Sequence, residues 1–327
     1  ATPARVHSSV HDTGRLAQMT HTCDTPLSLD TNRTLMNQTA HYRFSGPALL
    51  PMYARALLAS SKGGRQSAAD IPGLSADIEG VRTDTTELRR YRDVCGFMTS
   101  SLCPITWPHI LAFALHIRLM TDAAFPLPLM GLVHVRNRIE QQRAIRQGET
   151  VELQAWIANA TDTERGIEFD ILTQASSAGT VIWREYSTLL YRQPTGNNGK
   201  DGKKQPPEAP QMLSGQATVQ APGNIGYRYG RVSGDMNPIH LHPLSAKAFG
   251  FPRNIAHGMW SKAHCLALME KAEGQLEAVT ADAQFKKPFF IPGSGILTWE
   301  RNQSETPFRL LNRDGSAPHL EGLLSRG

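Results

Sequence analysis

The 327-residue chain is long enough for two domains of ordinary size, and its 40% apolar content suffices for a core in each. Only 19% of its residues are charged, and 34 Lys and Arg against 29 Asp and Glu leave a formal charge of +5 in short, scattered clusters. This composition excludes disorder as the general state and a concentrated nucleic-acid-binding face.

Membrane insertion and secretion are not expected. The longest apolar run, residues 110–120, is shorter than a membrane span and is interrupted by His116 and Arg118. No secretory leader precedes the first domain, and the last three residues do not match a peroxisomal signal. We therefore expect a cytoplasmic protein, with the peroxisome or another organelle matrix as the alternative. The cysteines lack C-x-x-C spacing and are expected to be free thiols: Cys23, Cys95, Cys103 and Cys265.

The first half of the chain predicts one buried helix followed by strands. Residues 1–40 show no periodicity and are taken as an N-terminal extension without an assigned function. In the first domain, residues 41–192, the segment 107–122 is apolar on nearly all sides, as expected of a helix wrapped by other structure. Runs rich in Val, Ile, Thr and aromatic residues then predict four strands: 132–141, 150–159, 166–175 and 180–192.

The second half repeats this order of elements after a linker. Residues 193–212 alternate prolines with glycines and charges, so neither helix nor strand can persist there. In the second domain, residues 213–327, a helix is predicted at 255–272. Strands are predicted after it at 278–287, 296–302, 308–313 and 319–324. The expected fold class is α+β, with two antiparallel sheets each curled round a long central helix.

The most informative segment for function is residues 229–240, which we expect to leave a short β-type run and turn sharply. Gly234 permits a tight bend, and Pro238 pushes Asn237 toward an extended conformation, so the loop should be stiff. Asp235 and His240 flank the turn, and a carboxylate and an imidazole held this way can grip one water for proton transfer. The competing interpretation is that Asp235 and Asn237 merely cap a turn and that His240 is structural.

A second feature adds an oxyanion donor to this pair. Gly258 lies in the first turn of the helix predicted at 255–272. N–H groups in the first turn have no intrahelical partner and lie at the positive end of the helix dipole. The amide of Gly258 can therefore receive negative charge that develops on a thioester oxygen.

The motif Y-x-x-V-S-G-D-x-N-P-I-H at 229–240 resembles the signature of the MaoC-like, or hydratase 2, family of (R)-specific enoyl-CoA hydratases. The A-H-G-M block at 256–259 falls where the family has its second block. The resemblance is strong over 226–267 and weaker over 286–293, and His242 stands where the family often carries an acidic residue. It implies a double hot-dog fold and reversible hydration of trans-2-enoyl-CoA to (3R)-3-hydroxyacyl-CoA.

The resemblance also implies residue roles. Asp235 and His240 would be the catalytic pair, Asn237 would orient the pair or the water, and the Gly258 N–H would bind the thioester oxygen. Further substrate contacts are expected from Ser233, His257, Phe125, Leu129, Lys286 and Lys287. Coenzyme A is part of the substrate, and no other cofactor and no metal are implied.

The first half resembles the N-terminal half of the family's two-hot-dog members at 125–134 and 136–140. Before its helix, in 101–108, it carries no D-x-N-P-x-H motif, so we expect it to be catalytically silent. Its interior would then be free to hold an acyl chain, lined by Phe113, Leu115 and residues 125–132. The alternative is that it only completes a pseudo-dimer.

Other readings concern the cations and histidines. Two interpretations of the cations stay open: they bind the phosphates of coenzyme A, or they are ordinary solvated strand ends. The residues concerned are Arg136, Arg138, Arg143, Arg146, Lys286 and Lys287. An H-x-H pair with two further histidines suggests a metal cluster only weakly, because the spacing of a recognisable zinc site is missing. The histidines concerned are His240, His242, His257 and His264.

The same fold can also carry functions other than hydration. P-loop, G-x-G-x-x-G and G-x-S-x-G motifs are absent, which argues against nucleotide hydrolysis, dinucleotide chemistry and serine hydrolysis. An acyl-CoA thioesterase would use the same oxyanion site, and a non-catalytic acyl-CoA-binding subunit would need no acid–base pair. The expected partner is an acyl-CoA thioester, with neither nucleic acid nor membrane, and a homodimer of two-domain chains is the expected assembly.

Overall fold

The computed structural model describes residues 38–44, 66–193, 210 and 212–326. The first half holds two short 3-10 turns, Ala68–Asp70 and Leu129–Gly131, with helices α3 (Thr86–Cys95) and α4 (Trp107–Met120). Its strands are β1 (Gln38–Phe44), β2 (Gly73–Arg82), β3 (Leu132–Gln141), β4 (Thr150–Thr163), β5 (Gly166–Ser177) and β6 (Thr180–Arg192). The predicted helix and the four predicted strands of this half are confirmed.

The second half begins with β7 (Gly215–Ala221) and continues through three helices before its long helix. These are α5 (Ile225–Ser233), α6 (Pro238–Leu241), α7 (Pro243–Ala248) and then α8 (Gly258–Glu273). The strands that follow are β8 (Val279–Phe285), β9 (Gly293–Trp299), β10 (Glu305–Asn312) and β11 (Pro318–Arg326). The predicted linker lies almost entirely outside the described residues, as does the predicted N-terminal extension.

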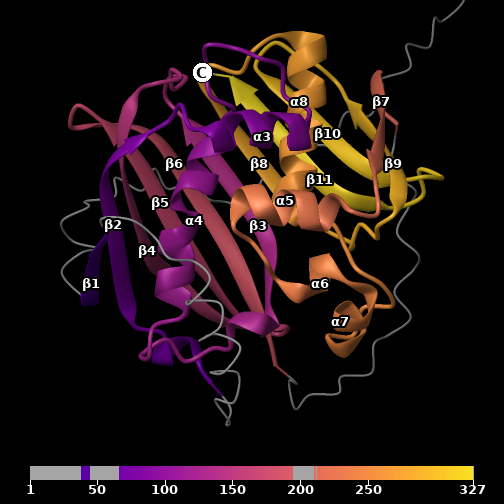
Figure 1. The fold of residues 1–327 in the computed structure, drawn as a ribbon. Helices are drawn as coiled ribbons and strands as arrows, with labels where there is room; N and C mark the ends of the chain where they lie inside the picture. The colour runs from indigo at the N-terminus through magenta and orange to yellow at the C-terminus, as the bar shows by residue number, and fades with distance from the viewer. Residues whose placement is uncertain (1–37, 45–65, 194–209, 211, 327) are drawn as a thin grey trace, which may run out of the picture. The chain divides into compact units, whose positions relative to one another are not determined.

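The strands of both halves form one sheet in the order β1-β2-β4-β5-β6-β3-β8-β11-β10-β9-β7. The halves meet where β3 pairs antiparallel with β8, from Arg136 opposite Gln284 to Gln141 opposite Val279. Figure 1 shows α4 lying against the first-half strands and α8 against those of the second half. The α+β hot-dog plan predicted from the sequence is confirmed, with the two half-sheets joined edge to edge.

Each central helix is held by burial on almost every side. In α4, Pro108 is the second residue of the helix, and Ala112, Leu115 and Leu119 are all at most 1% exposed. This helix packs on β2, β4 and β5. In α8, the apolar residues Ala263, Leu266 and Ala267 are equally buried, but Lys262 is buried with them at 0% exposure. A buried lysine needs polar partners, because desolvation disfavours its charge.

The sequence predicted a β-type run before the Asp235 loop. This prediction is wrong, because that segment is the helix α5. Its inward residues recur at helical spacing, and two of them are glycines: a Cβ at Gly226 would lie 1.9 Å from the carbonyl oxygen of His240, and one at Gly230 would lie 2.8 Å from that of Asp235. Only glycine allows the helix to approach the loop so closely. The Tyr and Val residues of this segment have a high β propensity, but the close packing of α5 against the loop outweighs that preference.

Two sequence expectations about other residues are settled by burial. Cys95, Cys103 and Cys265 are free and buried, and burial raises the pKa of each thiol, for Cys103 to about 11. Cys23 lies outside the described residues. No helix of the described residues is both long and apolar enough to span a membrane.

Candidate active site

The loop between α5 and α6 is fixed by its own side chains. Gly234 ends α5 with φ at +80°, a left-handed conformation that glycine adopts without strain. The Ser233 hydroxyl donates to the Tyr229 carbonyl at 2.9 Å and accepts the Asp235 N–H at 3.1 Å. Asp235 Oδ1 accepts the Asn237 N–H at 3.2 Å, and Asn237 Oδ1 accepts the N–H of Ile239 at 3.3 Å. The loop is therefore stiff, as the sequence predicted.

Asp235 and Asn237 both cap turns, which was the competing interpretation of the motif. In the structure, the capping hydrogen bonds use Oδ1 of each residue. The Asp235 side chain is still 28% exposed. Burial acts to raise the pKa of Asp235, but the neighbouring His257 and His240 and the Asn237 N–H outweigh it and lower that pKa. Asp235 is therefore a carboxylate at neutral pH, available as a hydrogen-bond acceptor.

The imidazole of His240 is 8% exposed and is held by backbone from another segment. Its Nδ1 donates to the Ile255 carbonyl at 2.9 Å, which leaves Nε2 as the nitrogen with a lone pair. Residues 254–256 are pinned there because Ile255 N–H donates to the Ile239 carbonyl at 3.2 Å and Ala256 N–H to that of Phe289 at 2.8 Å. Burial lowers the pKa of His240, partly opposed by Asp235, so the ring is neutral at pH 7.

His257 completes a group of three with Asp235 and His240. Its ring stacks on that of His240 with centroids 3.7 Å apart, and its Nε2 donates to the Asp235 carbonyl at 3.0 Å. Burial lowers the pKa of His257 to about 3, so it is a neutral ring supporting the pair rather than a cation beside Asp235. The three residues offer one ligand atom each within 4.8 Å of one another.

The amide predicted as an oxyanion donor is at the start of α8, next to this group. Gly258 is the first residue of the helix, where the N–H has no intrahelical acceptor. The site is also tight, because a Cβ there would lie 3.0 Å from the ring of Phe285, and the ring would have to shift to accept it. Glycine thus lets the aromatic ring and the helix start approach each other.

These residues face a cavity of about 400 Å³ lined by both halves of the chain. Nine residues predicted from the sequence to be in the site line this cavity: Ser233, Asp235, Asn237, His240, His257, Gly258, Leu129, Lys286 and Lys287. The structure does not place Phe125 with them: it is 1% exposed, and its ring packs edge-on against Phe169 at 5.4 Å. Leu115 is also buried away from the cavity, whereas Phe113 lines it.

Most of the candidate phosphate-binding cations are already paired with carboxylates. Arg136 bonds Glu168 at 2.6 Å, Arg138 bonds Asp282 at 2.8 Å, and Arg143 bonds Glu149 at 2.5 Å. Lys286 bonds Glu321 at 3.1 Å. Arg146 lines a different hollow, whereas the exposed Lys287 lies at the cavity and has no ion pair with any described residue.

The histidine cluster suggested by the H-x-H pair does not assemble. His242 is exposed and caps α7, and His264 bonds the Cys95 carbonyl, so only His240 and His257 meet. A second group that could hold a metal is His109, His116 and Glu185, whose ligand atoms also lie within 4.8 Å of one another. One ring nitrogen of each histidine is already bonded, His109 Nδ1 to Glu185 and His116 Nε2 to Thr173.

Sequence reasoning missed the polar cavity residues that the first half contributes. His109 and His116, two turns apart on α4, line the cavity together with His134 from β3. Two histidines at a seven-residue spacing on an otherwise apolar helix were a usable signal, because seven residues return nearly to the same helix face. They indicate a polar stripe where the sequence suggested only apolar lining.

Comparison with known proteins places the chain in a family. Residues 204–306 match the MaoC like domain. The 3-hydroxyacyl-thioester dehydratase X of Mycobacterium tuberculosis is 32% identical over 252 residues, covering 76% of this chain and 88% of the relative. A probable enoyl-CoA hydratase 2 of Dictyostelium discoideum is 27% identical over 203 residues, covering 57% of this chain and 67% of the relative.

Solved structures agree with the sequence matches. The crystal structure of HtdX of Mycobacterium tuberculosis superposes with a TM-score of 0.67 at 30% identity, covering 77% of this chain and 99% of that one. A second protein of that organism, described as a double hotdog fold, has a TM-score of 0.51 at 11% identity over 80% of this chain and 98% of its own, which supports the fold alone. The chain belongs to the MaoC-like dehydratase family.

Proposed function

We propose that this protein catalyses the reversible hydration of trans-2-enoyl-CoA to (3R)-3-hydroxyacyl-CoA, with Asp235 and His240 activating one water. The observation that carries the proposal is the spacing of this pair in the cavity wall. A nitrogen of His240 lies within 4.8 Å of a carboxylate oxygen of Asp235. Two hydrogen bonds of about 2.8 Å that meet at one water span about 4.6 Å, and this upper limit therefore supports a single water bridging the pair.

The chemistry follows from the two acceptors. The water donates one hydrogen to the Asp235 carboxylate and the other to Nε2 of His240. As one proton leaves to this pair, the oxygen adds to C3 of the substrate and the C2–C3 π electrons move toward the thioester oxygen. The proton is then returned to C2, so the sum is addition of water across the double bond. The reverse path removes water by the same groups.

Gly258 and His257 support this path in different ways. The Gly258 N–H stabilises the enolate oxygen, and loss of one such donor typically costs about 10²- to 10³-fold in rate. The neutral His257 ring packs on His240 and donates to the Asp235 backbone, which holds the pair in place. All of these steps use only the chain's own residues, and the proposal includes no metal or separate cofactor.

The substrate and the product stereochemistry are part of the proposal. Relatives named as a 3-hydroxyacyl-thioester dehydratase and an enoyl-CoA hydratase support an acyl-thioester substrate. Lys287 at the cavity gives one exposed cation for a phosphate of coenzyme A. The (3R) configuration rests on the resemblance of the 229–240 motif to (R)-specific hydratases.

The test is incubation of the purified protein with trans-2-enoyl-CoA of four to sixteen carbons. Hydration removes the absorbance of the conjugated enoyl-thioester without releasing a thiol, and chiral analysis of the product should give the 3R alcohol. Release of free coenzyme A instead would identify a thioesterase. A properly folded protein that does neither, in the forward or the reverse direction, would refute the proposed reaction.

A further inference from the structure

The wall that the first half contributes to the cavity is largely apolar but carries several polar side chains. His109 and His116 come from α4, His134 from β3 and Ser187 from β6, and all four line the same cavity as Asp235 and His240. His109, His116 and Ser187 are 6%, 2% and 3% exposed. In a mostly apolar pocket, a few precisely placed polar side chains serve to orient a polar group of the ligand, and an unsubstituted acyl chain has no such group.

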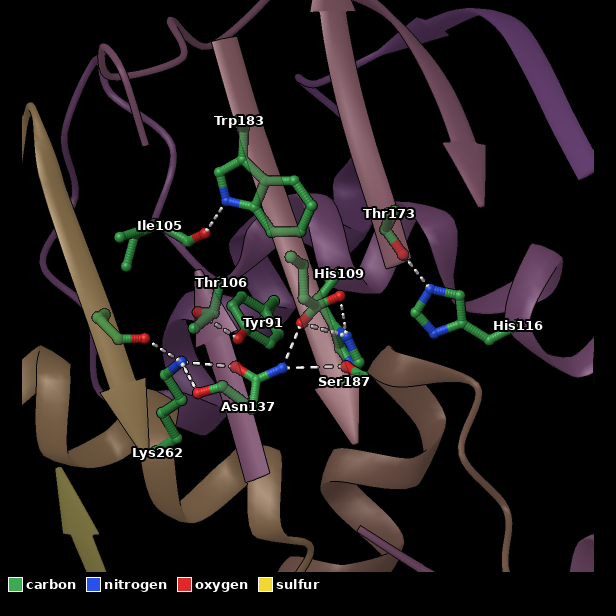
Figure 2. Close-up of polar contacts among 12 residues, drawn as sticks. Tyr91, Ile105, Thr106, His109, His116, Asn137, Thr173, Trp183, Ser187 and Lys262 are labelled. Atoms are coloured by element: carbon green, nitrogen blue, oxygen red, sulfur yellow. Dashed lines mark hydrogen bonds and ion pairs between the residues drawn. The ribbon is translucent and has the colours of Figure 1, made fainter. Parts of the chain in front are cut away.

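Figure 2 shows a hydrogen-bond network that joins Lys262, Asn137, Ser187 and His109. Glu185, which bonds both Asn137 and His109, is 0% exposed. Lys262 Nζ reaches three acceptors: Asn137 Oδ1 at 2.5 Å, the Asn137 carbonyl at 3.1 Å and the Ala281 carbonyl at 2.8 Å. Because lysine only donates, Asn137 must turn Oδ1 toward it. The Asn137 Nδ2 group then donates to Glu185 at 2.7 Å and to the Ser187 hydroxyl at 3.0 Å.

This network sets the orientation of His109. Glu185 accepts from His109 Nδ1 at 3.0 Å, so the second ring nitrogen, Nε2, is the one available to the cavity. Nε2 makes no hydrogen bond to the residues that the structure describes. Ser187 accepts from Asn137, so its own hydroxyl hydrogen can still be donated.

The contact between the two halves does not require His109 or Ser187. Lys262, Asn137 and Ala281 already bridge β3, α8 and β8 without His109 or Ser187. Replacing a buried charged network by packed apolar side chains is often neutral or stabilising. A buried carboxylate that orients an imidazole toward a ligand cavity is therefore better explained by a ligand than by stability.

We propose that the acyl chain of the physiological substrate carries a hydroxyl group, which binds His109 Nε2 and Ser187 Oγ in the first half of the cavity. A hydroxyl both donates and accepts, so it matches the ring nitrogen and the serine together. The inference rests on the proposed function for the identity of the acyl thioester, and it makes the first half the part that selects the chain.

The test measures binding rather than turnover, so that it stands apart from the proposed reaction. Saturated octanoyl-CoA is compared with octanoyl-CoA carrying one hydroxyl at carbon 5, 6, 7 or 8, by calorimetry on the full chain. One positional isomer should bind about 10- to 100-fold more tightly than the parent, because the parent leaves buried polar groups unpaired. His109→Leu should abolish the preference, and His109→Gln should restore part of it.

Two further variants control the result. Phe113→Leu changes the volume of the same wall, with its ring centroid 6.1 Å from that of His109, and should leave the ratio of the two affinities unchanged. Ser187→Ala keeps the His109–Glu185 pair and should reduce the ratio by about 3- to 10-fold, which covers the case that His109→Leu fails to fold. Equal affinity for the parent and every hydroxylated isomer, or a ratio that His109→Gln and Ser187→Ala do not change, overturns the proposal. Failure to hydrate enoyl-CoA would refute the proposed reaction and leave these ratios intact.

Discussion

Replacing His116 by glutamine should make the fold less sensitive to acid. The His116 ring is 2% exposed, its Nε2 bonds the Thr173 hydroxyl at 2.7 Å, and burial lowers its pKa to about 3. An imidazole in the unfolded chain titrates near pH 6.5, so the unfolded state binds more protons between these values. Stability therefore falls as the pH drops from about 6.5 toward about 3.

The size of the effect follows from the two pKa values. Between pH 7 and pH 5, a group that moves from about 6.5 unfolded to about 3 folded removes about 2 kcal/mol of unfolding free energy. His134, with a pKa of about 4, and His257, with a pKa of about 3, act in the same direction. Glu270 has the opposite effect on stability. Burial raises its pKa to about 7, so protonation of Glu270 between pH 7 and pH 5 favours the folded state. These other groups remain in the variant, so the difference isolates His116.

The assay is urea denaturation of the wild type and His116→Gln at both pH values, with linear extrapolation to water. The loss of stability from pH 7 to pH 5 should be about 2 kcal/mol smaller in the variant. Ile117→Val is the matched control on the same helix: it should cost about 1 kcal/mol at both pH values and leave their difference unchanged. An identical pH dependence in wild type and His116→Gln would show that the buried ring is not held neutral.

Three further predictions concern the candidate active site. Asp235→Asn and His240→Ala should each lower turnover by about 10²- to 10⁴-fold with the fold retained. Because the two residues act as a unit, the double variant should be little worse than the poorer single variant. A folded Asp235→Asn protein with near-native turnover would contradict the assignment. Gly258→Ala should lower kcat by about 10-fold or more, because its Cβ would press on Phe285, and in a Phe285→Leu background the same change should cost less. Lys287→Glu should raise KM for coenzyme A esters by about fivefold but not for short thioesters without phosphates, and an equal effect on both would remove the phosphate role.

Local sequence patterns were sufficient to predict the helices and strands whose periodicity and breaks are visible within the segment itself. The long helices α4 and α8 and the strands after them follow from apolar periodicity and from Pro and Gly breaks. The stiffness of the 234–238 segment follows from the φ of Gly234 and Pro238. What the local pattern could not give was α5, because only the carbonyls of residues 235 and 240 explain Gly226 and Gly230.

Contacts across the sheet were beyond the reach of a single sequence. The pairing of β3 with β8 joins strands about 140 residues apart, and nothing in either strand specifies the other. The Lys262–Asn137–Glu185–His109 network depends on that pairing, so none of its members could be placed in the site. The sequence also predicted an apolar chain-binding interior in the first half, and Phe125 was assigned to it because adjacent hydrophobic residues cannot be sorted into core and lining without a structure.

The network also argues against treating the two halves as independent units. Of the three acceptors around Lys262 in α8, two belong to Asn137 in β3 and only one, the Ala281 carbonyl, belongs to the second half. Separating the halves would remove two of these three acceptors and uncover the edge of β8 that pairs with β3. Burial already lowers the pKa of Lys262 to about 7, so the lost acceptors would have to be replaced by water or the amine would lose its proton. The half that holds Asp235 and His240 therefore depends on β3 for its stability as well as for the opposite wall of its cavity.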